Sequence, residues 1–115
     1  MERLKGKKKI EQLFVAGVSV GAFPLRMVYL RGGDKHLVGV SVSKKKFKNA
    51  VDRNRIKRLL RVVVEKQLSV VLDTLDSKYC LMLLYVGKEI PSSDQLKKPF
   101  ELLIKQFNKK ESHEV

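Results

Sequence analysis

The sequence predicts a single α+β domain, residues 1–115, in which helices pack on one mixed sheet. Its 115 residues and 43% hydrophobic content suit one buried core of a soluble domain. Two segments alternate in the manner of half-buried strands, three repeat apolar residues at helical spacing, and one apolar run is typical of a central strand. The order is therefore helix, two or three strands, helix, strand, helix, without an internal repeat.

The first helix is predicted over residues 7–16. Its apolar side is formed by Ile10, Leu13 and Phe14. Gly17 follows in the C′ position, where glycine commonly ends a helix. A very short strand is expected at residues 18–20. The next strand covers residues 23–30, with Pro24 near its beginning, and one of its faces carries Leu25, Met27 and Tyr29.

A glycine-containing turn at residues 31–35 separates this strand from a second alternating strand at residues 37–43. We expect these two strands to pair as a hairpin. One face of the second strand carries Val38, Val40 and Val42, and the other carries Gly39, Ser41 and Ser43. That small, polar face is either a solvated sheet surface or a surface that the backbone of a ligand can approach.

Residues 51–68 form the predicted central helix, which begins just after Asn49. Asn49 can cap the first turn, and Asp52 lies where a carboxylate meets the positive end of the helix dipole. Because successive side chains are about 100° apart, apolar and basic residues separate onto opposite faces. The apolar stripe comprises Ile56, Leu59, Leu60, Val63 and Val64. The opposite stripe comprises Asn54, Lys57, Arg58 and Arg61.

The rest of the chain supplies one strand and one helix. The central helix is expected to continue or bend through residues 73–77. Residues 78–86 are rich in β-forming apolar side chains, which predicts a central strand buried on both faces. After a loop at residues 87–94, a helix is predicted over residues 95–108, with helical spacing of Leu96, Phe100, Leu103, Ile104 and Phe107. The tail, residues 109–115, is expected to fray.

Positive charge is concentrated in the first part of the chain. The sequence holds 25 Lys and Arg against 12 Asp and Glu, a formal charge of +13. Residues 1–61 carry 17 basic and 4 acidic side chains, whereas residues 62–115 carry 8 of each. Residues 44–61 contain nine basic side chains and a single acid. Such density repels itself unless a polyanion neutralises it, so this segment indicates a phosphate-binding surface.

Catalysis by the side chains themselves is not indicated. His36 lies in a predicted turn and His113 in the tail, and no cluster has metal-ligand or triad spacing. Cys80 is the only cysteine, which excludes an internal disulfide and favours a reducing cytoplasm. Residues 13–22 do not suit a secretory signal because two glycines dilute them, and residues 79–86 are far shorter than the roughly 20 residues of a membrane span.

The motif around the central helix also resembles a known family. Gly39-Val-Ser-Val-Ser43, then Lys44-Lys45, then Asn49 to Arg61 with its Arg53-Asn54-Arg55 run, resemble the signature of the bacterial ribonuclease P protein subunit. The resemblance extends more loosely over nearly the whole chain. It implies a two-layer sandwich like domain 2 of ribosomal protein S5, with a left-handed β-α-β crossover, an exception to the usual hand.

The resemblance also implies a function and its partners. In that family the RNA subunit performs the metal-dependent hydrolysis that frees the mature 5′ end of tRNA, and the protein assists as an accessory subunit. The expected partners are the catalytic RNA and precursor tRNA, with no membrane and no small-molecule substrate. No cofactor is expected on the protein alone, and Mg²⁺ is expected with the RNA subunit.

Two sets of site residues follow. The expected RNA-binding set is Lys44, Lys45, Lys46, Lys48, Asn49, Arg53, Asn54, Arg55, Lys57, Arg58 and Arg61. The resemblance further implies a cleft for the single-stranded 5′ leader, between the first helix and the sheet, at Phe14, Tyr29, Ser41 and Ser43. Aromatic stacking beside basic groups suits extended single strands.

Two departures from the family pattern bear on these sets. Ile10 stands where the family often has a second aromatic residue, which favours a core role for Ile10. Phe47-Lys48 replaces a common glycine in a loop that is one residue longer, and Phe47 either packs inward or touches RNA.

Two other functions are compatible with the same charge pattern. One is a general RNA-binding module without a catalytic RNA partner. The other is a basic amphipathic helix that lies on an anionic membrane or is taken by another protein.

Overall fold

The chain forms one five-stranded mixed sheet with helices on both faces. The structure is a computed structural model and describes residues 2–112. The sheet order is β1-β4-β5-β3-β2. The elements are β1 (Glu2–Arg3), α1 (Lys7–Ala16), β2 (Val18–Ala22), β3 (Leu25–Arg31), β4 (Leu37–Val42), α2 (Ala50–Val63), a π-helical turn η1 (Val64–Leu68), α3 (Ser69–Asp73), β5 (Tyr79–Tyr85) and α4 (Ser93–Ser112). The predicted α+β class with one mixed sheet is therefore confirmed.

The strand pairing differs from the hairpin expected between β3 and β4. β5 lies between them, antiparallel to β3 and parallel to β4. The true hairpin joins β2 to β3, with Val18 opposite Tyr29 and Ala22 opposite Leu25, around the tight turn at residues 23–24. β4, the long helix and β5 thus form a parallel β-α-β unit. This placement of β5 explains its apolar composition, since a central strand is covered on both faces.

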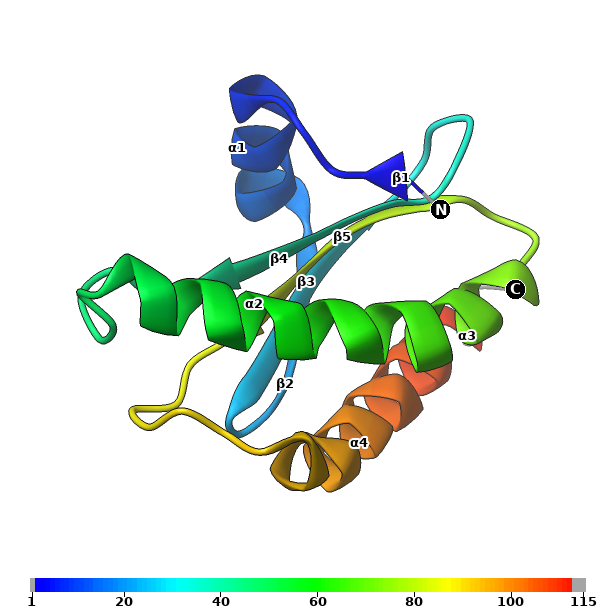
Figure 1. Cartoon of the computed structure of the whole chain (residues 1–115). Helices are drawn as coiled ribbons and strands as arrows, with labels where there is room; N and C mark the ends of the chain where they lie inside the picture. Colours follow the sequence, from blue (N-terminus) through cyan, green and yellow to red (C-terminus); the bar gives the residue numbers. More distant parts are fainter. Residues whose placement is uncertain (1, 113–115) are drawn as a thin grey trace.

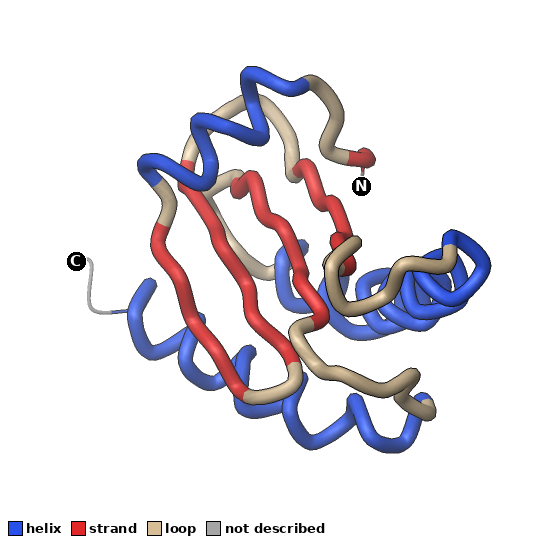
Figure 2. Tube along the Cα trace, turned by 90° about the vertical axis from the view of Figure 1, so that its left-hand side faces the viewer, coloured by secondary structure: helices blue, strands red, loops and turns tan. Residues whose placement is uncertain are grey.

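The two faces of the sheet carry different layers (Figure 1). The α2 and α4 helices cover one face, where the larger core joins residues such as Met27, Leu60, Leu83 and Phe100. Helix α1 crosses one end of the opposite face (Figure 2), and a smaller core there joins Leu4, Leu13, Val28 and Met82. Helix α1 thus adds a short third layer to the sandwich. Among residues 2–112, no helix is both long and apolar enough to cross a membrane.

Helix α1 has the predicted bounds, and glycine ends it for a reason other than the expected one. Gly17 has an extended conformation, with φ −77°, and its N–H donates to the carbonyl of Leu13 at 2.8 Å. A Cβ at this position would overlap that same carbonyl oxygen. The glycine therefore permits a close approach of two backbone segments where the chain leaves α1 and enters β2.

The central helix continues beyond residue 68 to Asp73, in line with the expected continuation, and contains one π-helical turn. Its buried residues recur every four positions, at Ile56, Leu60, Val64, Leu68 and Leu72. An α-helix has 3.6 residues per turn, so a four-residue repeat drifts around its surface. The wider π turn at η1 takes up this drift, because it has more residues per turn than the flanking α segments. Leu68 and Leu72 consequently face the same core as Ile56 and Leu60.

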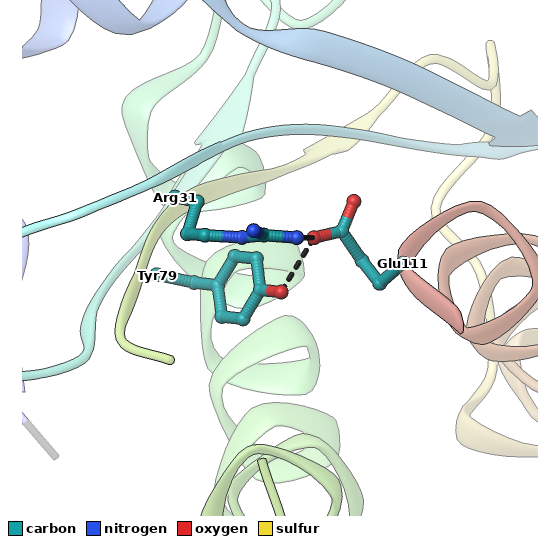
Figure 3. A network of polar contacts seen from close by, with 3 residues as sticks. All are labelled: Arg31, Tyr79 and Glu111. Atoms are coloured by element: carbon teal, nitrogen blue, oxygen red, sulfur yellow. Dashed lines mark hydrogen bonds and ion pairs between the residues drawn. The ribbon is translucent and has the colours of Figure 1, made fainter. Parts of the chain in front are cut away.

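The C-terminal helix does not fray at residue 109 as expected, because α4 continues to Ser112. Glu111, near its end, accepts hydrogen bonds from the hydroxyl of Tyr79 and from Nη2 of Arg31, the latter at 3.1 Å (Figure 3). Arg31 and Tyr79 are opposite each other on β3 and β5. One carboxylate therefore ties the last turn of α4 to two neighbouring strands. The rest of the expected frayed tail, residues 113–115, lies outside the described residues.

His36 is a buried structural residue in the segment between β3 and β4. Its Nδ1 accepts a hydrogen bond from the backbone N–H of Tyr79 at 3.2 Å, and its ring lies parallel to the Tyr79 ring. Burial, and secondarily the charge of Lys78, lower the pKa of His36 from its ordinary value of 6.5. Protonation would place a hydrogen on Nδ1 and remove the acceptor that Tyr79 uses.

We expect this histidine to make the fold less stable in mild acid. Because the folded pKa is lowered, the unfolded chain binds more protons below about pH 6.5, so the free energy of unfolding falls as pH decreases through that point. His36→Asn keeps a side-chain acceptor but cannot titrate there. Urea unfolding of this variant between about pH 7 and pH 5 should show a shallower loss of stability than the parent chain. Equal slopes for the two proteins would contradict this role of His36.

Candidate nucleic-acid interface

The basic helix α2 is fixed by its apolar stripe. Ile56 and Leu60 are both 0% exposed and belong to the larger core. Asn49 caps the helix as predicted, since its Oδ1 accepts from the N–H of Val51 at 2.9 Å, and Asp52 lies in the first turn. The amphipathic character and the starting point predicted for this helix are confirmed. Figure 1 shows α2 lying across the sheet, so the side of the helix opposite the buried Ile56 and Leu60 faces away from the sheet.

The cations of α2 border hollows on both flanks of the helix. Arg55 and Arg58 are exposed and line a groove of about 340 Å³ with Leu59, Val62, Pro91 and Ser92. Arg61 is half-buried on the other flank. There it lines a pocket of about 430 Å³ at the β1 and β4 edge, together with Arg3, Ile10, Val40, Glu65 and Ser69. A single long rod thus presents positive charge toward two concave surfaces.

The basic loop before α2 is anchored by Phe47. This side chain is 7% exposed, and its ring lies 6.0 Å from the ring of Tyr85. Of the two alternatives left open by the sequence, the inward-packed one is therefore correct. Lys46 is also tied down, because its Nζ donates to the carbonyl of Val86 at 2.6 Å. The hydroxyl of Ser43 accepts a bond from the N–H of Lys46 at 3.4 Å, so Ser43 helps to form the turn.

Arg53 points back to this loop. Its Nη1 donates to the carbonyl of Phe47 at 2.7 Å and to the carbonyl of Lys48 at 3.0 Å. Arg53, Lys46 and Asn49 thus make hydrogen bonds to other groups of the same chain. The other side chains of the expected RNA-binding set have no polar partner among residues 2–112; they are Lys44, Lys45, Lys48, Asn54, Arg55, Lys57, Arg58 and Arg61.

Within residues 2–112, no carboxylate forms an ion pair with the cations of residues 44–61. The ion pairs that the structure describes within residues 2–112 lie elsewhere, joining Arg31 to Glu111, Lys35 to Glu2 and Lys97 to Asp94. Since like charges repel, the cations of residues 44–61 raise the free energy of the isolated protein, and a row of phosphates would remove that cost.

The expected leader cleft needs a correction at Tyr29. Its side chain is 2% exposed and packs between Tyr79 and Phe107, with ring centroids 6.0 and 4.8 Å away. Strand alternation puts Tyr29 on the face covered by α4, whereas its neighbour Val28 faces α1. Burial, assisted by the Glu111 carboxylate, raises the pKa of Tyr29. The ring is a core residue and does not meet Phe14.

The face that α1 only partly covers still carries candidate contacts. Phe14 is 46% exposed on α1, while Ile10 is half-buried against the smaller core. Ser41 lies on this face in a cross-strand row with Leu84 and Arg26. Arg26 was not among the residues expected at this site, because the sequence analysis placed the cleft on the strand face of Tyr29, and Arg26 lies on the other face. Its Nε donates to the hydroxyl of Ser19 at 2.9 Å.

Groups that could hold a metal or act as nucleophiles are sparse. Among residues 2–112, no three His, Cys, Asp or Glu side chains gather closely enough to bind a metal ion. Cys80 is half-buried and free, and burial raises the pKa of its thiol. A raised pKa leaves less of the thiolate, which is the nucleophilic form.

The fold and this surface define a small α+β protein with a cationic helix lying across a mixed sheet. Comparison with known proteins gives a narrower assignment. The family model for ribonuclease P matches residues 1–108. A ribonuclease P protein component from Porphyromonas gingivalis strain W83 is 36% identical over 98 residues, which cover 78% of this chain and 71% of that protein. The chain therefore belongs to the ribonuclease P protein family.

Other similarities agree with this assignment. A ribonuclease P protein component from Lactobacillus helveticus is 39% identical over 67 residues, covering 56% of this chain and 55% of that protein. The solved structure of the Staphylococcus aureus RNase P protein superposes with a TM-score of 0.73 at 23% identity, covering 91% of this chain and 94% of that one. The Thermotoga maritima RNase P protein gives 0.71 at 19% identity, covering 90% and 96%. At these identities the two structures support the fold.

Proposed function

We propose that this chain is the accessory protein subunit of ribonuclease P and binds two RNAs at once. Its basic loop and α2 contact the catalytic RNA subunit. The partly open sheet face beside α1 contacts the 5′ leader of precursor tRNA. Hydrolysis of the phosphodiester bond, with Mg²⁺ as the metal ion, belongs to the RNA subunit in this proposal. The protein assists removal of the leader and acts in the cytoplasm.

The observation that carries this proposal is the set of eight polar and basic side chains on the loop and α2 that have no polar partner in the described part of the chain, residues 2–112. Five of them lie on α2, which the fully buried Ile56 and Leu60 fix to the core, and three lie on the loop that the buried Phe47 anchors, so their spacing is defined before any partner arrives. Folded RNA offers phosphates along grooves and backbones at comparable density, and contact releases condensed counterions. Family membership supports a catalytic RNA as the particular partner.

The decisive experiment is reconstitution with a bacterial ribonuclease P RNA. At low magnesium, phosphates of the RNA are poorly neutralised, so a basic protein subunit should restore 5′ processing that the RNA alone performs poorly. We expect the full chain to increase the cleavage rate of precursor tRNA under these conditions. If the chain binds the RNA without changing the rate, a general RNA-binding module is the correct description. If anionic vesicles bind the chain and RNA does not compete, the helix is a membrane-surface element.

Contact with the leader predicts a selective effect of Phe14→Ala. Stacking of a base on an aromatic ring is worth roughly 1 to 3 kcal/mol, so the reconstituted enzyme should lose affinity for a precursor with a leader. Its affinity for mature tRNA should stay unchanged. Val15→Ala is the matched control, since Val15 is the next residue of α1 and is 88% exposed. Equal losses for the precursor and the mature tRNA would remove the leader contact from the proposal.

A further inference from the structure

We infer that the two arginines of the Arg53-Asn54-Arg55 run have different roles. Arg53 is a positioning residue that holds the loop of residues 44–48 in a binding conformation. Arg55 is free to contact RNA directly. This inference rests on the proposed function, since the loop is taken to bind the catalytic RNA, and it concerns how that surface is built.

The contacts of Arg53 supply the first step. Both carbonyls that its Nη1 binds, those of Phe47 and Lys48, belong to the loop, at 2.7 and 3.0 Å. Two carbonyls can use both hydrogens of this nitrogen, which leaves Nη1 no hydrogen for a phosphate. Arg55, in contrast to Arg53, is exposed and has no polar partner among residues 2–112.

Helix geometry explains why neighbours in sequence differ so much. Arg53 lies three residues before the buried Ile56, about 60° from its direction around the helix. This boundary position leaves Arg53 partly buried beside the loop. Arg55 lies about 100° from Ile56 on the other flank, at the groove that it shares with Arg58 and Pro91.

The loop itself depends on a few anchors. Phe47 is buried against Tyr85, and its N–H donates to the carbonyl of Ser43 at 3.1 Å. Lys46 holds the carbonyl of Val86. Arg53 closes the arrangement by binding the two carbonyls that follow the turn. Three exposed lysines of the loop, Lys44, Lys45 and Lys48, have no polar partner within residues 2–112.

A planar guanidinium suits this task better than an ammonium. Its N–H groups have a fixed fork geometry, and a delocalised charge is more easily kept half-buried than the strongly hydrated lysine head. Arg53→Lys should therefore behave like Arg53→Gln, despite the retained charge. Arg55→Lys should behave almost like the parent chain if Arg55 supplies a simple phosphate contact.

The first test needs no RNA and so does not depend on the proposed function. Amide hydrogen exchange of the free full-length protein is measured for Arg53→Gln, Arg53→Lys and the matched control Arg55→Gln. The amide of Phe47 should exchange at least several-fold faster in both Arg53 variants than in the parent chain. In Arg55→Gln its exchange rate should equal that of the parent chain. The buried amides of β5 report whether each variant is folded. Unchanged exchange at Phe47 in a folded Arg53 variant would overturn the inference.

The second test measures the salt dependence of binding to a bacterial ribonuclease P RNA. Loss of one phosphate contact should lower the log-log slope by about one, as expected for Arg55→Gln. Arg53→Gln should lower the slope by about two to three, because the loop lysines are then no longer held in position to contact phosphates. In a background with Lys44, Lys45 and Lys48 changed to glutamine, Arg53→Gln should have no further effect, whereas Arg55→Gln should still lower the slope.

The possible outcomes distinguish a failure of the proposed function from a failure of the inference about Arg53. If the parent chain fails to bind the RNA, the proposed function fails, and the exchange measurement still decides the structural role of Arg53. If the parent chain binds and Arg53→Gln has the same effect in both backgrounds, Arg53 is a direct contact and the inference is wrong. If Arg53→Lys restores the slope of the parent, charge alone is sufficient and the inference is again wrong.

Discussion

Replacing both Arg58 and Arg61 by glutamate is expected to weaken binding of a ribonuclease P RNA by on the order of 100-fold or more. A hydrogen bond to a charged group is worth about 1.5 kcal/mol or more, so each lost contact costs roughly tenfold, and the new carboxylates repel phosphates. The log-log salt slope should also become shallower by about two, one unit for each contact. Both quantities are obtained from a filter-binding or anisotropy titration at several salt concentrations.

The same change of net charge on α4 provides the control. Lys98 and Lys105 are exposed on that helix and line neither of the two hollows that the α2 arginines border, and changing both to glutamate removes as much positive charge. Only the long-range attraction should weaken, and salt screens it within about 10 Å at 0.1 M ionic strength. Equal losses for the two double variants would mean that net charge, and not the α2 surface, determines affinity.

Leu60→Ala is expected to give the largest loss of stability among changes on α2. Leu60 is fully buried in the larger core, and truncation of such a leucine costs about 2 to 5 kcal/mol. Small domains have only about 5 to 15 kcal/mol in total, so the midpoint of urea unfolding should fall strongly. The control is Val62→Ala, two residues further along the helix and 46% exposed, which should change the midpoint little.

RNA should partly reverse the effect of Leu60→Ala. A partner that binds only the folded state stabilises it in proportion to the logarithm of its concentration over Kd. The variant should therefore regain structure on titration with RNA, and its salt slope should match that of the parent. A reduced slope in the folded complex would contradict the assignment of Leu60 to the anchoring side alone.

Local patterns in the sequence predicted the helices well. The bounds of α1, the cap at Asn49 and the apolar stripe of α2 follow from spacing and capping chemistry over a few residues. The four-residue repeat from Ile56 to Leu72 is present in the sequence, but the π turn that accommodates it was not predicted. The end of α4 was missed because Glu111 is held by strand residues that are distant in sequence.

Strand pairing was less accessible from the same patterns. A glycine turn between two alternating strands is a good hairpin signal, yet β5 inserts between β3 and β4. The position of a strand that is distant in sequence depends on which surfaces remain uncovered after the helices pack. The spacing of residues within one segment contains no information about that. For the same reason alternation placed Tyr29 with Leu25 and Met27 correctly, but could not tell that α4 covers this face.

The candidate site was predicted as a set of residues, without a division of their roles. Charge density identified residues 44–61, and all of them lie on or beside α2. The internal bonds of Arg53 and Lys46 depend on the path of the loop backbone, which composition does not encode. Half of the expected leader residues changed character as well, since Tyr29 is in the core and Ser43 stabilises a turn.

Lysine reactivity of the unmodified protein, measured with and without a ribonuclease P RNA, identifies which helix the RNA covers. Brief acylation followed by mass spectrometry reports which ammonium groups the RNA covers. We expect protection of Lys44, Lys45, Lys48 and Lys57, with unchanged reactivity of Lys97, Lys98 and Lys105 on α4. Protection confined to α4, or spread equally over both helices, would contradict the claim that the loop and α2 form the RNA-binding surface.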